Sequence, residues 1–188
     1  MTIFGRLLRM RKIVVVELAV FVISANAFSI VIEARGQYFS PSEKSFKDIY
    51  GGGWKYGGEI GFSITRHLDF WVSGNNFSKK GKLTFTQEES KLSILSAGGG
   101  LRYRLTTGAI SGYTAAGANY YRFKESNPIG DVRKGGVGFE GRAGVLIKIV
   151  RGLLVDLNIG YSYCKMKPAD FDINIGGIEA GVGLAVDF

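Results

Sequence analysis

The sequence has little of three residue types that often carry chemistry or shape: one cysteine, one histidine and three prolines among 188 residues. The lone Cys164 excludes an intrachain disulfide. The lone His67 has no serine and acid clearly converging on it, so a hydrolytic triad has no support, and no metal-ligand spacing is present. Scarce proline together with 13% aromatic residues argues against a disordered chain. These absences predict a folded, non-enzymatic chain with no cofactor, metal or catalytic residue.

The first 27 residues have the three-part layout of a secretory signal peptide. A basic leader precedes an apolar stretch at 13–23, which Glu17 interrupts, and Ala25, Asn26 and Ala27 form a small-x-small cleavage site. The stretch is too short to span a bilayer as a helix. We therefore predict a signal peptide at 1–27 and one mature domain at 28–188, the alternative being a short buried or anchoring helix. The leader's basic residues are Arg6, Arg9, Arg11 and Lys12.

Net charge gives no sign of a nucleic-acid partner. The chain has 24 basic and 16 acidic residues, and removing the leader's four basic and one acidic residue leaves a charge of +5. The short cluster Lys79, Lys80 and Lys82 falls in a predicted loop, where a solvated turn is the simplest interpretation. An exported protein also has no accessible nucleic acid, so this partner class is excluded.

Alternation of apolar and polar residues, the pattern of a β-strand, recurs after residue 27, whereas no sustained 3.6-residue period appears. At the C-terminus, every second residue from Ile178 to Phe188 is apolar, and the residues between them are small or charged. In 109–123 the phase is ambiguous, so its faces stay unassigned. Trp71 falls on the polar face of its segment, where a narrow interior could use its bulk. The predicted strands are 28–39, 50–65, 67–77, 90–105, 109–123, 136–149, 153–164 and 175–188.

The connections alternate in length. Tight turns at 65–67, 106–108 and 150–152 separate longer polar loops at 40–49, 78–90, 124–135 and 165–174. Short turns at one rim and long loops at the other are typical of an outer-membrane barrel, and an even strand number returns both termini to the same side.

The residue types on the polar face indicate whether the apolar face points outward against lipid or inward as the core of a soluble protein. A soluble sandwich or lipocalin-like barrel, the alternative, directs apolar residues inward and bulky polar residues outward. Here the polar face is mostly glycine, serine and alanine with isolated charges of both signs, which suits a cramped interior. The apolar face carries tyrosine and tryptophan near strand ends, as in an interfacial girdle. We therefore predict an all-β fold: an eight-stranded antiparallel up-and-down transmembrane β-barrel.

Hydrocarbon excludes an open sheet edge, so the first and last strands must pair. The last strand has a second predicted role, because its alternation ending in an aromatic residue is the kind of signal that outer-membrane assembly machinery reads. The residues of this predicted signal are Val182, Leu184, Val186 and Phe188.

Inward-facing charges nearly cancel, and an eight-stranded barrel is just wide enough to be filled by its own side chains. We interpret them as a structural ion-pair network that plugs the lumen; the alternative is a gated ion pathway along the same residues. The predicted lumen network is Glu33, Arg35, Lys55, Glu59, Asp69, Arg102, Arg104, Glu140, Arg142, Lys148, Asp156 and Glu179.

The mature chain resembles the small eight-stranded outer-membrane barrels of the OmpX, opacity-protein and OmpA-barrel type. The resemblance rests on the export signal, the four-loop rhythm, the segments "YGGGWKYGGEIGFSI" and "GYSYCKMKPADFDINIGGIEAGVGL", and Phe188. It implies a bacterial outer-membrane location and roles in adhesion, serum resistance or envelope integrity. Related barrels include lipid A-modifying enzymes with a histidine and a serine on the outer face, and this sequence has no histidine near a predicted extracellular rim.

The predicted function is therefore a monomeric, non-enzymatic barrel with a plugged lumen that anchors four exposed loops. The alternatives are a narrow channel or transporter for small solutes or ions and, less favoured, a lipid A-modifying barrel enzyme. Expected partners are outer-membrane lipid or lipopolysaccharide, the assembly machinery, and host or envelope components that contact the loops.

Overall fold

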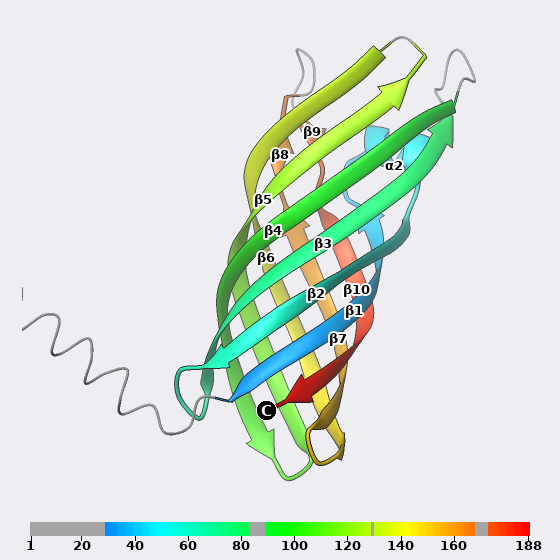
Figure 1. The fold of residues 1–188 in the computed structure, drawn as a ribbon. Coiled ribbons are helices and arrows are strands. Elements are labelled where there is room, and N and C mark those ends of the chain that lie inside the picture. The colour runs from blue at the N-terminus through cyan, green and yellow to red at the C-terminus, as the bar shows by residue number, and fades with distance from the viewer. Residues whose placement is uncertain (1–28, 83–88, 129, 168–172) are drawn as a thin grey trace, which may run out of the picture.

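The computed structural model describes residues 29–82, 89–128, 130–167 and 173–188, and the predicted signal peptide lies outside them. Eight strands form one closed antiparallel barrel in which neighbours in the chain are neighbours in the sheet (Figure 1). The predicted eight-stranded up-and-down barrel is confirmed. Its strands are β1 (Ile30–Pro41), β2 (Gly53–Ser63), β3 (Leu68–Lys82), β4 (Glu89–Thr107), β5 (Ile110–Asn127), β6 (Gly130–Val150), β7 (Leu153–Tyr163) and β10 (Gly177–Asp187).

The first and last barrel strands close the sheet, as predicted. β1 pairs with β10 from Val31 opposite Asp187 to Pro41 opposite Gly177. Beyond this ladder the backbone N–H of Phe188 donates to the carbonyl oxygen of Ile30 at 3.0 Å. Both strands therefore have partners along both of their edges, which removes the unpaired donors and acceptors of an open sheet.

The two ends of the barrel differ in their connections. At one end, the turn end, short connections join β2 to β3, β4 to β5 and β6 to β7, as the sequence predicts. Gly108 (φ 63°) and Gly152 (φ 81°) supply the positive φ that two-residue hairpin connections favour. The opposite end, the loop end, carries the helix α2 (Lys44–Tyr50) and a two-stranded sheet of β8 (Lys165–Met166) and β9 (Ile173–Asn174) (Figure 1).

Two segments that the sequence predicts as loops are largely hairpin extensions. β3 and β4 stay paired up to Lys82 and Glu89, and β5 and β6 up to Asn127 and Gly130. The sequence prediction assigned these segments to loops because they are polar. A hairpin that projects beyond the apolar belt, however, needs no continuous apolar face.

The helix α2 replaces part of a predicted loop and the start of a predicted strand. Phe46 and Tyr50, four residues apart and hence on one helix face, are both buried. The Tyr50 hydroxyl lies 2.9 Å from the Ser90 hydroxyl of β4, and Gly51 (φ 64°) ends the helix. The prediction that Tyr50 belongs to the second strand is wrong. Among the described residues, no helix has the length and hydropathy needed to cross a bilayer.

The barrel has apolar side chains outside and polar ones inside, as predicted. Trp71 is fully buried in the interior. For β5, whose faces the sequence leaves open, Tyr113, Asn119 and Tyr121 are buried while Thr114 and Tyr120 are exposed. Its phase is ambiguous because tyrosine and alanine occur on both faces. Exposed apolar side chains of the wall include Leu95, Leu101, Val137, Phe139, Leu157, Ile159, Val182 and Leu184.

Candidate functional site

Glu59 of β2 is the centre of an ion-pair cluster in the lumen. Its carboxylate lies 2.5 Å from Arg142 Nη2 and 3.3 Å from Arg35 Nη2, and it also pairs with Arg102. The Glu59 side chain is only 1% exposed. One carboxylate therefore contacts guanidinium groups from β1, β4 and β6, which ties distant strands together across the barrel.

Two further acids balance the three arginines. Arg35 Nε lies 2.7 Å from a Glu33 oxygen and 3.8 Å from an Asp156 oxygen. With Glu59, the cluster has three carboxylates and three guanidinium groups. Because buried charges are tolerated only when paired and hydrogen-bonded, this balance suits a structural role. The central cluster is Glu33, Arg35, Glu59, Arg102, Arg142 and Asp156.

Neutral side chains hold the Asp156 end of the central cluster. The Tyr113 hydroxyl donates to the Asp156 carboxylate, with distances of 2.9 and 3.0 Å to its two oxygens. Asn158 Nδ2 donates to the same carboxylate at 2.6 Å, and Gln37 Nε2 donates to Asn158 Oδ1 at 2.8 Å. These bonds satisfy an acid that would be costly to bury without partners.

Aromatic rings cover the arginines of the central cluster. The Arg102 guanidinium lies 5.0 Å from the centre of the Tyr113 ring, and that of Arg142 lies 5.3 Å from the Trp71 ring. Both distances are within cation–π range. Trp71 and Tyr113 therefore fill the width of the lumen and also stabilise its cations.

The remaining predicted network residues lie in smaller groups. Lys55 pairs with Glu179, which also accepts a hydrogen bond from Ser162 at 2.9 Å. Glu140 accepts a 2.7 Å bond from Asn119 and lies 4.0 Å from Arg142 Nη1, which joins it to the edge of the central cluster.

A separate pair lies near the turn end. Arg104 Nη2 is 3.2 Å from Asp69, which accepts a 3.0 Å bond from the Ser63 hydroxyl. Lys148 lies outside these groups, because its side chain is exposed near the end of β6.

An apolar cap inside the loop end is a feature that sequence reasoning missed. Phe39, Phe77 and Phe123 have the inward parity of their strands yet are large and apolar. Large apolar residues at inward positions near the loop end are the sequence signal that could have revealed this cap. These side chains and buried residues of α2 form one cluster, which lies between the ion pairs and the loop end. The apolar cap is Phe39, Phe46, Tyr50, Phe77, Leu92, Ile94, Tyr121, Phe123, Cys164, Met166 and Ile175.

Two small cavities lie between the described side chains of the lumen. One cavity of about 10 Å³ has Arg35, Lys55 and Glu140 among its lining residues, and another of about 10 Å³ lies against Phe39, Phe77 and Tyr121. Each has room for about one water molecule. Toward the turn end, Trp71 and Leu146 are almost completely buried within a second apolar cluster. The lumen is thus packed with side chains at three successive levels.

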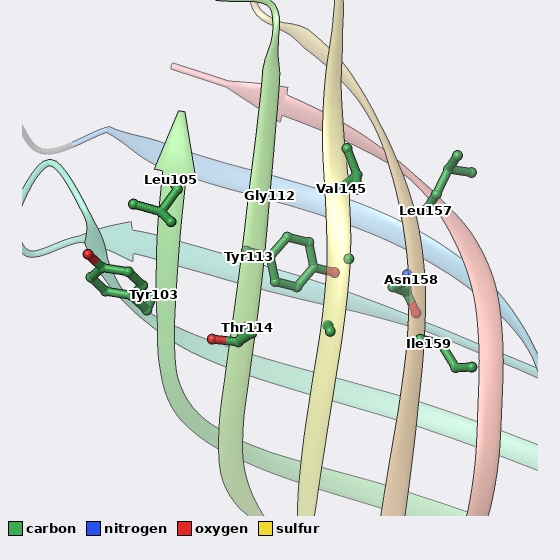
Figure 2. Close-up of a pocket in the computed structure, with 11 residues that line it drawn as sticks. Tyr103, Leu105, Gly112, Tyr113, Thr114, Val145, Leu157, Asn158 and Ile159 are labelled. Atoms are coloured by element: carbon green, nitrogen blue, oxygen red, sulfur yellow. The ribbon is translucent and has the colours of Figure 1, made fainter. Parts of the chain in front are cut away.

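The outer wall carries a larger groove, of about 630 Å³, across β4, β5, β6 and β7. Figure 2 shows Tyr103 and Leu105 on one flank and Leu157 and Ile159 on the other. Gly112, Ala143 and Gly144 also line it, and their small size leaves the hollow. Its lining is mostly apolar, and its polar side chains are Tyr103, Tyr113, Thr114 and Asn158.

The residues most often used in catalysis are poorly placed for it. His67 is exposed at the turn end, with Nδ1 3.1 Å from the Arg104 carbonyl oxygen. Cys164 is fully buried in the apolar cap. The described part of the chain has no group of three or more His, Cys, Asp or Glu side chains that could hold a metal ion.

The sequence matches no protein-family model and no curated protein. Solved structures do resemble the fold. Neisserial surface protein A is 17% identical with a TM-score of 0.65, over 86% of this chain and 97% of that chain. The outer membrane protein OprG of Pseudomonas aeruginosa is 13% identical with a TM-score of 0.63, over 86% and 96%.

A third similar structure is Ail, the attachment invasion locus protein of Yersinia pestis, in complex with the heparin analogue sucrose octasulfate. It is 14% identical with a TM-score of 0.50, over 84% of this chain and 97% of that chain. At these identities the likeness shows the fold alone. The chain has the fold of the small eight-stranded outer-membrane β-barrels that its sequence resembles.

Proposed function

We propose that this protein is exported by a signal peptide at residues 1–27 and inserts into the bacterial outer membrane as a non-enzymatic barrel. The exposed apolar wall supports insertion, because a soluble protein rarely exposes so large a contiguous apolar surface. Aromatic side chains near the loop end, such as Tyr38, Trp54 and Tyr56, are exposed on this wall, as an interfacial girdle requires.

We propose that the barrel is an anchor rather than a channel, because side chains fill its lumen. The apolar cap, the central cluster and the second apolar cluster, which contains Trp71 and Leu146, follow one another along the axis, and the two cavities described above each hold about one water. An aqueous pore normally needs about 16 strands.

The loop end is the part that we propose meets other molecules. Lys44, Lys47 and Arg133 are exposed there. Cations at the loop end would attract anionic envelope or host components. Ail, which is similar in fold, forms a complex with the heparin analogue sucrose octasulfate. We also propose that Lys79, Lys80 and Lys82 contact lipopolysaccharide phosphates.

The last strand supports the proposed assembly signal. Val182, Leu184 and Val186 lie on the outer face of β10, and Phe188 is 73% exposed beyond its end. Assembly machinery could therefore contact these side chains without opening the lumen.

Fractionation of cells that express the full chain tests the location. We expect the protein in the outer-membrane fraction, with Phe28 as its first residue after cleavage, and with slower electrophoretic migration after heating. A soluble protein that keeps residues 1–27 would contradict both the export and the membrane proposals.

Conductance in planar bilayers tests the closed lumen. We expect silence, because an ion would have to displace paired side chains of the central cluster and pass the apolar cap. Steady single-channel steps from the folded protein would favour the alternative of a narrow channel for small solutes or ions.

A further inference from the structure

A second groove, of about 420 Å³, lies on the outer wall near the loop end. It spans β4, β5 and β6, above the apolar belt and away from the lumen. Its lower part includes Leu95 and Tyr120, and cationic residues line its upper part. The groove is lined by Ser93, Leu95, Tyr120, Arg122, Phe123, Lys124, Arg133, Lys134 and Gly135.

Strand register places apolar and cationic side chains next to each other on this wall. Arg122 lies opposite Leu95 on one side and Gly135 on the other, and Lys124 lies opposite Arg133. At Gly135, an added Cβ would collide with the Tyr120 hydroxyl, so the Tyr120 ring lies across this glycine. The tyrosine therefore marks the level at which the wall changes from apolar to cationic.

The upper part of this groove has an excess of positive charge. The Asp131 carboxylate lies 3.7 Å from Lys124 Nζ and 3.5 Å from Arg133 Nη2. Asp131 offsets part of the charge of those two cations, and Arg122, which is exposed on the same outer face, adds a third cation. One carboxylate against three cations leaves this part of the groove with a net positive charge, which attracts a further anion.

Below the groove, the outer face of β5 carries small residues. Below Tyr120 the next outward residues are Ala118 and Ala116, both exposed. Their small size leaves space beside the larger Val137 and Phe139 of β6, which are also exposed. A hydrocarbon chain that lies over these two alanines would end directly below the cationic residues.

We propose that this groove binds a phosphorylated lipid of the leaflet at the loop end. A phosphate would contact Arg122, Lys124 and Arg133, and an acyl chain would lie over Ala118 and Ala116. Guanidinium groups suit phosphate because they bind it with two parallel hydrogen bonds. The groove opens sideways onto the wall, which favours a lipid over a soluble anion. This inference depends on the proposed membrane insertion and adds a specific lipid site to it.

Binding of bisphosphorylated lipid A to the protein in phosphatidylcholine nanodiscs tests the site. We expect the double substitution Arg122→Gln and Arg133→Gln to weaken binding roughly 10- to 30-fold, from the typical attraction of cations to an anionic membrane surface. The matched control, Arg66→Gln with Arg151→Gln in the exposed connections of the turn end, removes the same charge away from the groove and should change binding less than about twofold.

Equal weakening by both double substitutions would overturn the proposal, because general electrostatic attraction would then explain the binding. Equal affinity for dephosphorylated lipid A, or displacement of the lipid by inorganic phosphate or sucrose octasulfate, would also overturn it. Heat-modifiable migration checks insertion of each variant separately. A protein that does not insert contradicts the proposed function, whereas an inserted protein with no phosphate preference contradicts the groove alone.

Discussion

Replacing Glu59 with glutamine should destabilise the barrel by about 3–5 kcal/mol, the range for removing one partner of a buried ion pair. The substitution keeps the shape of the side chain and removes its charge. Arg102 and Arg142 then lose the carboxylate that they share, and they remain buried close to Arg35. Urea unfolding of protein inserted in phospholipid vesicles measures the loss as a lower midpoint at unchanged slope.

Glu33→Gln provides the matched control. Glu33 is also buried in the central cluster, but its partner Arg35 keeps contacts with Glu59 and Asp156. We therefore expect a smaller loss, of about 1–3 kcal/mol. The exposed substitution Asp131→Asn should leave the midpoint unchanged. If Glu59→Gln unfolds at the same urea concentration as Asp131→Asn, then Glu59 is not the centre of the cluster.

This prediction depends on a feature that the sequence alone could not supply. Alternation shows that Glu59, Arg102 and Arg142 face inward, because side chains in a strand alternate between the two faces. Which of them meet depends on strand tilt and stagger around the closed barrel. Residues on β2, β4 and β6 meet across the lumen, and no spacing along the chain encodes that contact.

The loop end was harder to predict for a different reason. Within the apolar belt, one face of each strand must be apolar, so sequence and structure agree at Leu157, Asn158 and Trp71. Beyond the belt, water satisfies polar groups in helix, hairpin or loop alike. The polar sequence at 78–90 therefore did not reveal the extension of β3 and β4, and the pair Phe46 and Tyr50 did not reveal α2.

The lipid-facing assignment predicts opposite behaviour for two adjacent residues of β7. Leu157 is exposed on the outer wall, whereas Asn158 is buried and bonded to Asp156 and Gln37. Leu157→Arg should cost about 2–4 kcal/mol, because it places a cation near the middle of the hydrocarbon. Asn158→Arg should cost about 1–3 kcal/mol through crowding in a packed lumen.

Bilayer thickness separates these two causes, because only the first depends on lipid. In thinner bilayers an arginine at 157 can reach the interface with its charged group, so its unfolding penalty should shrink. The penalty at 158 should stay constant, since the lumen does not change with the lipid. Unfolding both variants in vesicles of long-chain and short-chain phosphatidylcholine measures the difference. A penalty at 157 that is independent of bilayer thickness would mean that this wall does not face hydrocarbon, and the proposed membrane insertion would then be wrong.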